Sequence, residues 1–217
     1  NNMENLNLIL PEIFISLSVM FLLVLGVFKK ESSKLIFNLS LFVILITMII
    51  TINETFSISR ATLFNQSVVI DHMSSFMKII TLIGGFLVLV ISSSYLKTFK
   101  LYNIEYPILI LSSILGMMVM ISSNDLIVFY MGLELQSLAL YVLATYNRDQ
   151  LKSSEAGLKY FVLSALSSGL LLYGCSLVYG FSGSTNFDVI SNQLNSSEYV
   201  LTFGIVFILV GLAFKIS

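Results

Sequence analysis

Seven stretches of the chain are almost wholly apolar, and each is bounded by charged or turn-forming residues. A helix that crosses the hydrocarbon core of a bilayer needs about 20 largely apolar residues. We therefore predict spans at roughly 9–28, 35–53, 73–96, 106–123, 125–146, 155–181 and from 199 to the last residue. A transmembrane β-barrel needs short segments of alternating polarity instead. The pattern predicts an all-α, polytopic transmembrane helix bundle with about seven spans.

The composition supports a membrane protein and excludes other classes. Hydrophobic residues make up 57% of the 217 residues and charged residues only 11%, whereas a soluble domain has about 25% charged residues. The net charge of −1 leaves no basic surface for nucleic acid. One Cys and one His cannot form a zinc, iron–sulfur or haem site. We expect no metal or cofactor in this chain, so any redox reaction that it serves must occur in another chain.

The basic residues of the loops predict the orientation. With the N-terminus outside, the inside loops carry seven basic residues, whereas the outside loops carry Arg60 alone; the seven are Lys29, Lys30, Lys34, Lys97, Lys100, Arg148 and Lys152. Loops on the cytoplasmic side are enriched in Lys and Arg, so this bias favours the span count and the N-out topology. The chain stops two residues after Lys215, and we expect a fragment or split gene product of a longer protein.

Glu134 is the clearest ionisable residue inside a predicted span, where such a group is costly and points to function. It lies about nine residues into the fifth span, and Tyr130, Ser137 and Tyr141 share its helix face at i−4, i+3 and i+7. This polar stripe must face protein or a water-filled cavity rather than lipid. The alternative role is an interhelical hydrogen bond that only holds the bundle together.

Two lysines also fall inside predicted spans. Lys159 opens the sixth span, where it can pair with Glu155 four residues earlier or extend to the membrane surface, so its role stays open between functional and structural. Lys215 lies about 16 residues along the seventh span with no acid within one turn. It must find an acid on another helix or lose its charge, because desolvation disfavours the ammonium form. Such a group suits a proton relay, whereas a permanently charged Arg does not.

Other residues carry structural expectations. Asp125 is expected to cap the N-terminus of the fifth span, and Lys78 to be an anchor at the membrane interface. His72 is expected at the interface as well, and Cys175 as a small buried hydrophobic residue. The small residues within 164–169 suit close helix packing.

The second half of the chain carries a family resemblance. The strings GLELQSL (132–138), EAGLKYF (155–161), SGLLLYGCSLVYG (168–180), GSTNF (183–187) and GLAFKIS (211–217) occur in this order. In order and spacing they resemble subunit N of bacterial NADH-quinone oxidoreductase, whose mitochondrial counterpart is NADH dehydrogenase subunit 2 of respiratory complex I. The first hundred residues are similar only in topology and in the LPEIF opening at 10–14.

The resemblance implies an antiporter-like proton-channel fold and a proton-translocating subunit in the membrane arm of a redox-driven pump. The family's fifth-helix glutamate falls on Glu134, its sixth-helix lysine on Lys159, and the lysine beside the break in helix seven on Lys215. Residues 1–104 would then hold helices one to three, and 105–217 the first part of the proton-translocating module. Family members have fourteen helices, so this chain would be truncated in helix seven, and we expect that it cannot conduct protons alone.

The resemblance also implies partners and location. NADH, FMN, iron–sulfur clusters and quinone are expected in partner subunits, with none bound by this chain. The partners are then the other membrane subunits of the complex and the lipid bilayer, in either a bacterial plasma membrane or a mitochondrial inner membrane.

The expected mechanism is an electrostatic relay. Glu134 stabilises the ammonium form of Lys159, and when this pair separates the lysine releases a proton towards Lys215. Two rivals remain. A subunit of a cation/proton antiporter would use the same three residues, and a purely structural membrane scaffold would use its charged pairs only to fix helix register.

Overall fold

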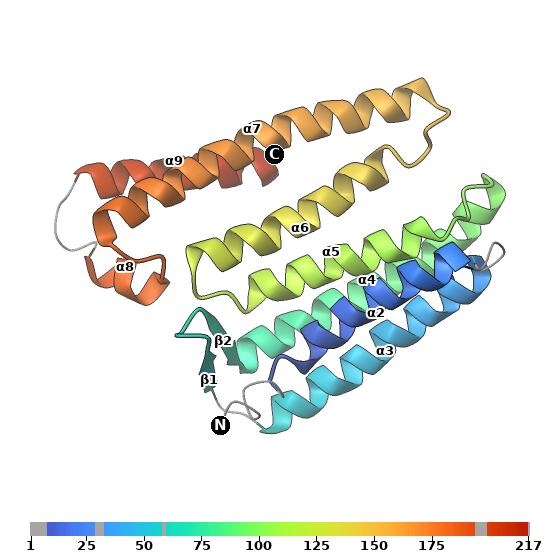
Figure 1. Cartoon of the computed structure of the whole chain (residues 1–217), viewed down its shortest axis with the longest axis horizontal. Coiled ribbons are helices and arrows are strands. Elements are labelled where there is room, and N and C mark those ends of the chain that lie inside the picture. Colours follow the sequence, from blue (N-terminus) through green and yellow to red (C-terminus); the bar gives the residue numbers. More distant parts are fainter. Residues whose placement is uncertain (1–7, 29–32, 58–59, 194–198, 217) are drawn as a thin grey trace.

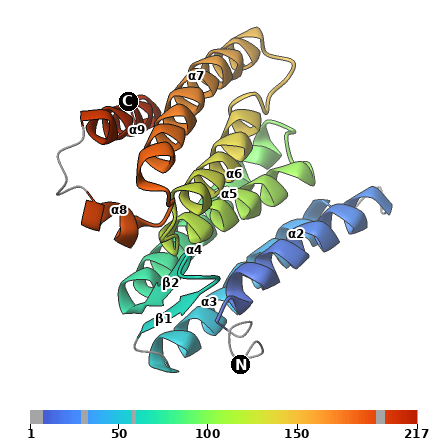
Figure 2. The same ribbon diagram turned by 60° about the vertical axis from the view of Figure 1, so that its left-hand side comes forward.

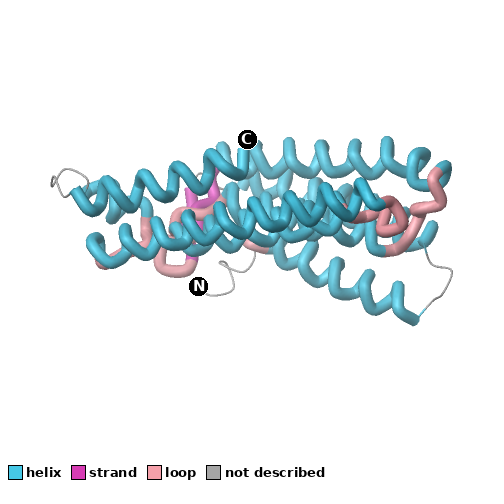
Figure 3. The backbone as a smooth tube through the Cα atoms, turned by 90° about the horizontal axis from the view of Figure 1, so that it is seen from above, coloured by secondary structure: helices cyan, strands magenta, loops and turns pink. Residues whose placement is uncertain are grey.

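The computed structural model describes residues 8–28, 33–57, 60–193 and 199–216. Within these ranges the long elements are helices that lie side by side (Figure 1), and they run along the long axis of the molecule (Figure 3). In chain order the elements are α2 (Leu10–Phe28), α3 (Ser33–Ser57), β1 (Arg60–Leu63), β2 (Val68–Asp71), α4 (His72–Thr98), α5 (Glu105–Ile121), α6 (Leu126–Ala144), α7 (Leu151–Ser182), α8 (Phe187–Gln193) and α9 (Tyr199–Ile216).

Each of the seven predicted spans coincides with a helix, so the predicted fold class is confirmed. Among the described residues, five helices are long and apolar enough to cross a membrane: α2, α3, α4, α6 and α7. Helix α5 and the 201–216 part of α9 are apolar but shorter. The protein is an integral membrane protein of the helix-bundle class.

One apolar core joins α2, α3, α4 and α5. Its buried side chains recur at spacings of seven residues, as in Ile15 and Leu22 of α2 and in Leu82, Leu89 and Leu96 of α4. A repeat of seven keeps one stripe of a helix against its neighbours along the whole contact. This spacing explains why the first four helices pack lengthwise.

A second apolar cluster joins α6, α7, α8 and α9. The link between the two halves is the tight contact of α5 with α6. A Cβ atom at Gly132 would lie 2.8 Å from the backbone nitrogen of Met120 and 2.9 Å from the carbonyl oxygen of Gly116. Only a residue without a side chain allows the two backbones to approach this closely.

The loops at one end of the bundle form a small folded cap, which we call the hairpin end. Strands β1 and β2 pair antiparallel, from Arg60 opposite Asp71 to Leu63 opposite Val68, and Figure 2 shows them beside α8 and the start of α6. The Val69 amide donates to the Ser122 carbonyl at 2.8 Å. The hairpin and α8 were not predicted.

The segment GSTNF completes the hairpin end. The Leu126 amide donates to the Thr185 carbonyl at 2.9 Å, and the Phe187 amide donates to the Asn124 carbonyl at 3.1 Å. The Asn186 side chain donates to the Gln66 carbonyl at 3.0 Å. This family-like segment therefore ties the end of α7 to the α5–α6 loop and to the hairpin.

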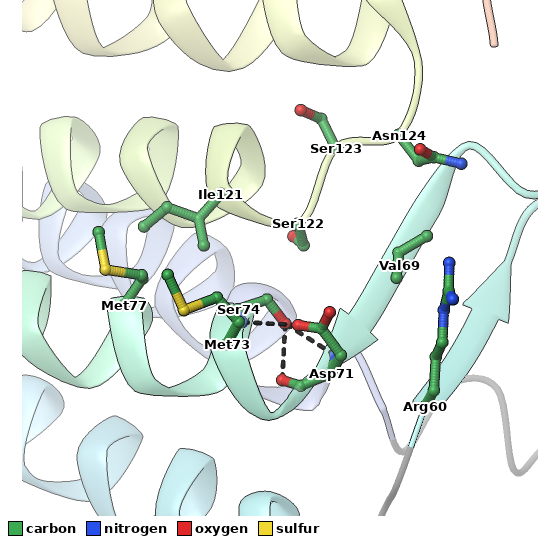
Figure 4. A pocket seen from close by; sticks show the side chains of 10 residues that line it. All are labelled: Arg60, Val69, Asp71, Met73, Ser74, Met77, Ile121, Ser122, Ser123 and Asn124. Carbon is green, nitrogen blue, oxygen red and sulfur yellow. Dashed lines mark hydrogen bonds between the residues drawn. The ribbon is translucent and has the colours of Figure 1, made fainter. Parts of the chain in front are cut away.

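A polar pocket of about 320 Å³ opens at the hairpin end (Figure 4), between β1, β2, α4 and the α5–α6 loop. At its floor Asp71 caps α4, since its carboxylate accepts from the Ser74 amide at 2.7 Å and the Ser74 hydroxyl accepts from the Asp71 amide at 2.9 Å. This reciprocal capping box stabilises the first turn of α4.

Candidate functional site

The centre of the candidate site is an ion pair between α6 and α9. The Lys215 ammonium contacts Oε1 of Glu134, and the Ser168 hydroxyl of α7 donates to the same oxygen. The Lys215 and Glu134 side chains are 9% and 20% exposed. Three helices therefore meet at one partly buried carboxylate.

The pair forms because α9 lies directly against α7 (Figure 2). A Cβ atom at Gly174 of α7 would lie 2.8 Å from the Gly204 carbonyl oxygen of α9. Close approach of the two backbones brings the last turn of α9, with Lys215, level with Ser168. A Cβ atom at Gly211 of α9 would lie 2.9 Å from the Ser167 carbonyl oxygen. Small residues at a helix contact are the usual means of such approach in membranes, so the expected packing role of the small residues within 164–169 is confirmed.

The predicted polar stripe of α6 faces protein. Tyr141 is buried, and its ring packs edge-on against Tyr160 and Phe161 of α7 with centroids 4.8 and 5.8 Å away. Tyr130 packs against the second apolar cluster. Ser137 donates to the carbonyl of Leu133 on its own helix at 2.7 Å. The stripe thus places Glu134 towards α7 and α9.

Lys159 does not join this site. Its ammonium binds the Glu155 carboxylate of the preceding helical turn at 2.6 Å, and the two side chains are 68% and 55% exposed. Ser168, which does reach Glu134, lies nine residues further along α7, about 13 Å along the helix axis. The expected Glu134–Lys159 pair is therefore wrong for this conformation; Glu134 binds Lys215 instead.

The sequence left two alternatives for Lys215, an acid on another helix or loss of its charge. The structure shows the first, because its partner Glu134 lies on α6. Ser168 was considered only as a packing residue. The signal that could have identified its contact is its place on the buried face of α7, together with Ser164 and Ser167. A serine hydroxyl there can donate to a carboxylate without a bulky side chain that would separate the helices.

Asp125 caps α6 as predicted. Its Oδ1 accepts from the amides of Ile127 at 2.8 Å and Val128 at 3.4 Å, and the Thr185 hydroxyl donates to its other oxygen. Cys175 is buried in the second apolar cluster, as expected. His72 is exposed at the first residue of α4, and its place at the membrane interface stays a prediction.

The expectation for Lys78 is wrong. An interfacial anchor would expose its ammonium, but the Lys78 side chain is 1% exposed and binds Glu12 of α2 at 2.5 Å. Its partner is 66 residues away in the sequence, so no local pattern indicates this pair.

The side chains of Glu134, Lys215 and Ser168 together are suited to holding and moving a proton. Within the described ranges, no three or more His, Cys, Asp or Glu side chains gather where they could hold a metal ion. An ammonium, a carboxylate and a hydroxyl in contact can exchange protons without a cofactor, because each can donate or accept once its partner's charge changes.

The chain is similar in sequence to known membrane proteins. Residues 123–217, which contain Glu134, Lys159, Ser168 and Lys215, match the family described as NADH:quinone oxidoreductase/Mrp antiporter, TM. The chain is 73% identical over 215 residues to NADH-quinone oxidoreductase subunit N of Pelagibacter ubique (strain HTCC1062). The matched region covers 99% of this chain and 45% of that protein. The chain thus spans less than half the length of this relative.

Solved structures share the fold. A chain of respiratory complex I from Thermus thermophilus with bound aureothin superposes with a TM-score of 0.77 at 24% identity, over 94% of this chain and 43% of that chain. A chain of the Mrp complex from Dietzia sp. DQ12-45-1b gives a TM-score of 0.76 at 20% identity, over 96% and 41%.

Proposed function

We propose that this chain, which belongs to the NADH-quinone oxidoreductase subunit N family over the length that it spans, forms part of the transmembrane proton pathway of a proton-pumping NADH:quinone oxidoreductase. The observation that carries the proposal is the partly buried Glu134–Lys215 pair with Ser168 inside the family-matched region. An ion pair between helices inside the membrane indicates a functional site by default, because charged side chains are costly there.

In the proposed relay Glu134 controls the proton affinity of Lys215. While the carboxylate is in contact, the ammonium form is favoured. When Glu134 is screened or moves away, the desolvated ammonium releases its proton, and Ser168 can relay it through its hydroxyl. Lys159, on an exposed face of α7, would then be a separate relay group that reaches Glu134 only after a rearrangement.

The remaining assignments follow from the family. NADH, FMN, iron–sulfur clusters and quinone would lie in partner subunits, and electron transfer there would drive the switch at Glu134. We place residues 1–104 as the N-terminal helices and 105–217 as the first part of the proton-translocating module. The bacterial source of the 73%-identical relative supports a bacterial plasma membrane rather than a mitochondrial inner membrane.

The test replaces Glu134 by Gln in the full-length protein and measures protons pumped per NADH oxidised in membrane vesicles. The proposal predicts an assembled complex with strongly reduced pumping. The matched control is Glu105→Gln, which changes an exposed carboxylate that binds Arg148 at 3.3 Å and should pump normally. Normal pumping by an assembled Glu134→Gln complex would disprove the role of Glu134.

A cation/proton antiporter subunit is the second candidate, favoured by the family description, which names Mrp antiporters. The same pair would then exchange protons against a cation. Transport that depends on Na⁺ and not on NADH would select this function.

A further inference from the structure

A second buried ionic group lies in α2, α3 and α4, outside the candidate site. Glu12 of α2 and Lys78 of α4 form an ion pair at 2.5 Å, with side chains 9% and 1% exposed. Glu54, near the end of α3, interacts electrostatically with both of them. We call Glu12, Glu54 and Lys78 the N-terminal cluster.

The N-terminal cluster has unused hydrogen-bonding capacity. Oε2 of Glu12 and Oε1 of Glu54 are buried, and neither has a hydrogen-bond partner in the part of the chain that the structure describes. A buried carboxylate oxygen without a partner is costly. A proton on one of the two carboxyl groups would remove that cost by neutralising the charge.

The charges of the cluster lead to the same conclusion. Two carboxylates face one ammonium, so a single negative charge stays uncompensated unless a proton is bound. Among the residues that the structure describes, Glu12 and Lys78 are the charged groups that interact with Glu54. The other titratable residues of the packed elements lie at the helix ends: Asp71 and His72 at the start of α4, and Lys34, Tyr95, Lys97, Glu105 and Tyr106 at the opposite end of the bundle.

We propose that the N-terminal cluster is a second protonatable centre, which holds one exchangeable proton shared between Glu12 and Glu54. The ammonium of Lys78 neutralises one carboxylate, and the bound proton neutralises the other. Loss of this proton leaves one net negative charge in the bundle, so its occupancy can respond to nearby charge. The proposal does not depend on the transport role of Glu134.

A groove opens beside this centre. It has a volume of about 340 Å³ and is lined by Glu12 and Ser16 of α2, by Leu115 and Val119 of α5, and by Leu135 of α6. Glu12 is the residue of the N-terminal cluster that lines this groove, which extends to Leu135, next to Glu134. Helix α5 still separates the two ionic groups, since it packs against both α2 and α6.

The test is infrared difference spectroscopy of the full-length protein in lipid vesicles at neutral pH, where the C=O stretch of a protonated carboxylic acid reports each buried proton. Glu54→Gln and Glu12→Gln should each abolish one such band, because the remaining carboxylate then pairs with Lys78. Lys78→Met should increase the band about two-fold, because both carboxyl groups must then be protonated to stay buried. The double variant Lys78→Met/Glu54→Gln should restore the wild-type intensity.

The control Glu105→Gln should leave the band unchanged, and circular dichroism checks that each variant is folded. An unchanged band in both glutamine variants would overturn the proposal, and so would a folded Lys78→Met protein without the increase. Pumping per NADH is not part of this readout, so failure of the proposed function would leave the infrared result unaffected.

Discussion

The ion pair between Glu134 and Lys215 should appear as a large coupling energy in a double-mutant cycle. Removing one partner of a fully buried pair costs about 3–5 kcal/mol. The side chains here are 9% and 20% exposed, and the remaining group can change its protonation state, so we expect about 2 kcal/mol for Glu134→Gln or Lys215→Met. The double variant leaves no unpaired charge and should cost about 1 kcal/mol, which gives a coupling of about 3 kcal/mol.

The assay is unfolding of the full-length protein in mixed micelles with increasing dodecyl sulfate, followed by circular dichroism. The matched control is the cycle for Lys159 and Glu155, an exposed i,i+4 pair with an expected coupling of about 0.5 kcal/mol. A Glu134–Lys215 coupling as small as that of the control would show that the two groups do not share a site.

Three further predictions test the packing, the cap and the loop that surround the site. Gly211→Ala would place a Cβ 2.9 Å from the Ser167 carbonyl oxygen, and it should destabilise the protein by about 1–3 kcal/mol in the same unfolding assay. The control Gly180→Ala, whose Cβ would have no described atom within 4 Å, should leave the stability unchanged. Equal effects of the two variants would contradict the close α7–α9 contact. Asp125→Ala removes a helix cap and the Thr185 hydrogen bond, so we expect a loss of about 2 kcal/mol, and an unchanged unfolding midpoint would contradict this. Burial, with a smaller contribution from Glu105, raises the pKa of Tyr146 to about 12. The fold should therefore lose stability between about pH 10, where an unfolded tyrosine ionises, and about pH 12. The measurement is phenolate absorbance, and a signal that appears near pH 10 and is absent in Tyr146→Phe would disprove the raised pKa.

The long helices could be predicted because each requires only local information. A run of apolar residues between charged or turn-forming positions specifies a span, whatever its neighbours are. The capping role of Asp125 is local as well, since its partners Ile127 and Val128 follow within three residues.

The hairpin could not be predicted in this way. Its two strands have four residues each, too few for a clear alternation of polar and apolar positions. Its turn places Phe64, Asn65 and Gln66 at positive φ, a conformation for which Phe and Gln carry no sequence signal. The hairpin is specified by its contacts with Ser122 and Asn186, which are distant in the sequence.

The partners of the buried charges could not be predicted for the same reason. Residue spacing identified Glu134 and Lys215 as costly groups within spans, but not that they bind each other across 81 residues of sequence. It also placed Lys78 at the interface, because Glu12 lies too far away in the sequence to be recognised as its partner. Among the ion pairs of the described residues, the one that lies within a single helical turn, Lys159 with Glu155, is exposed.

In the proposed relay Lys215 works by releasing its proton, and the Lys215→Arg variant of the full-length protein tests this step. Arginine keeps the positive charge and the pairing with Glu134 but cannot deprotonate. The measurement is protons pumped per NADH oxidised in vesicles that contain the assembled complex. We predict normal assembly with strongly reduced pumping; a wild-type ratio of protons to NADH would show that the pair has only a structural role.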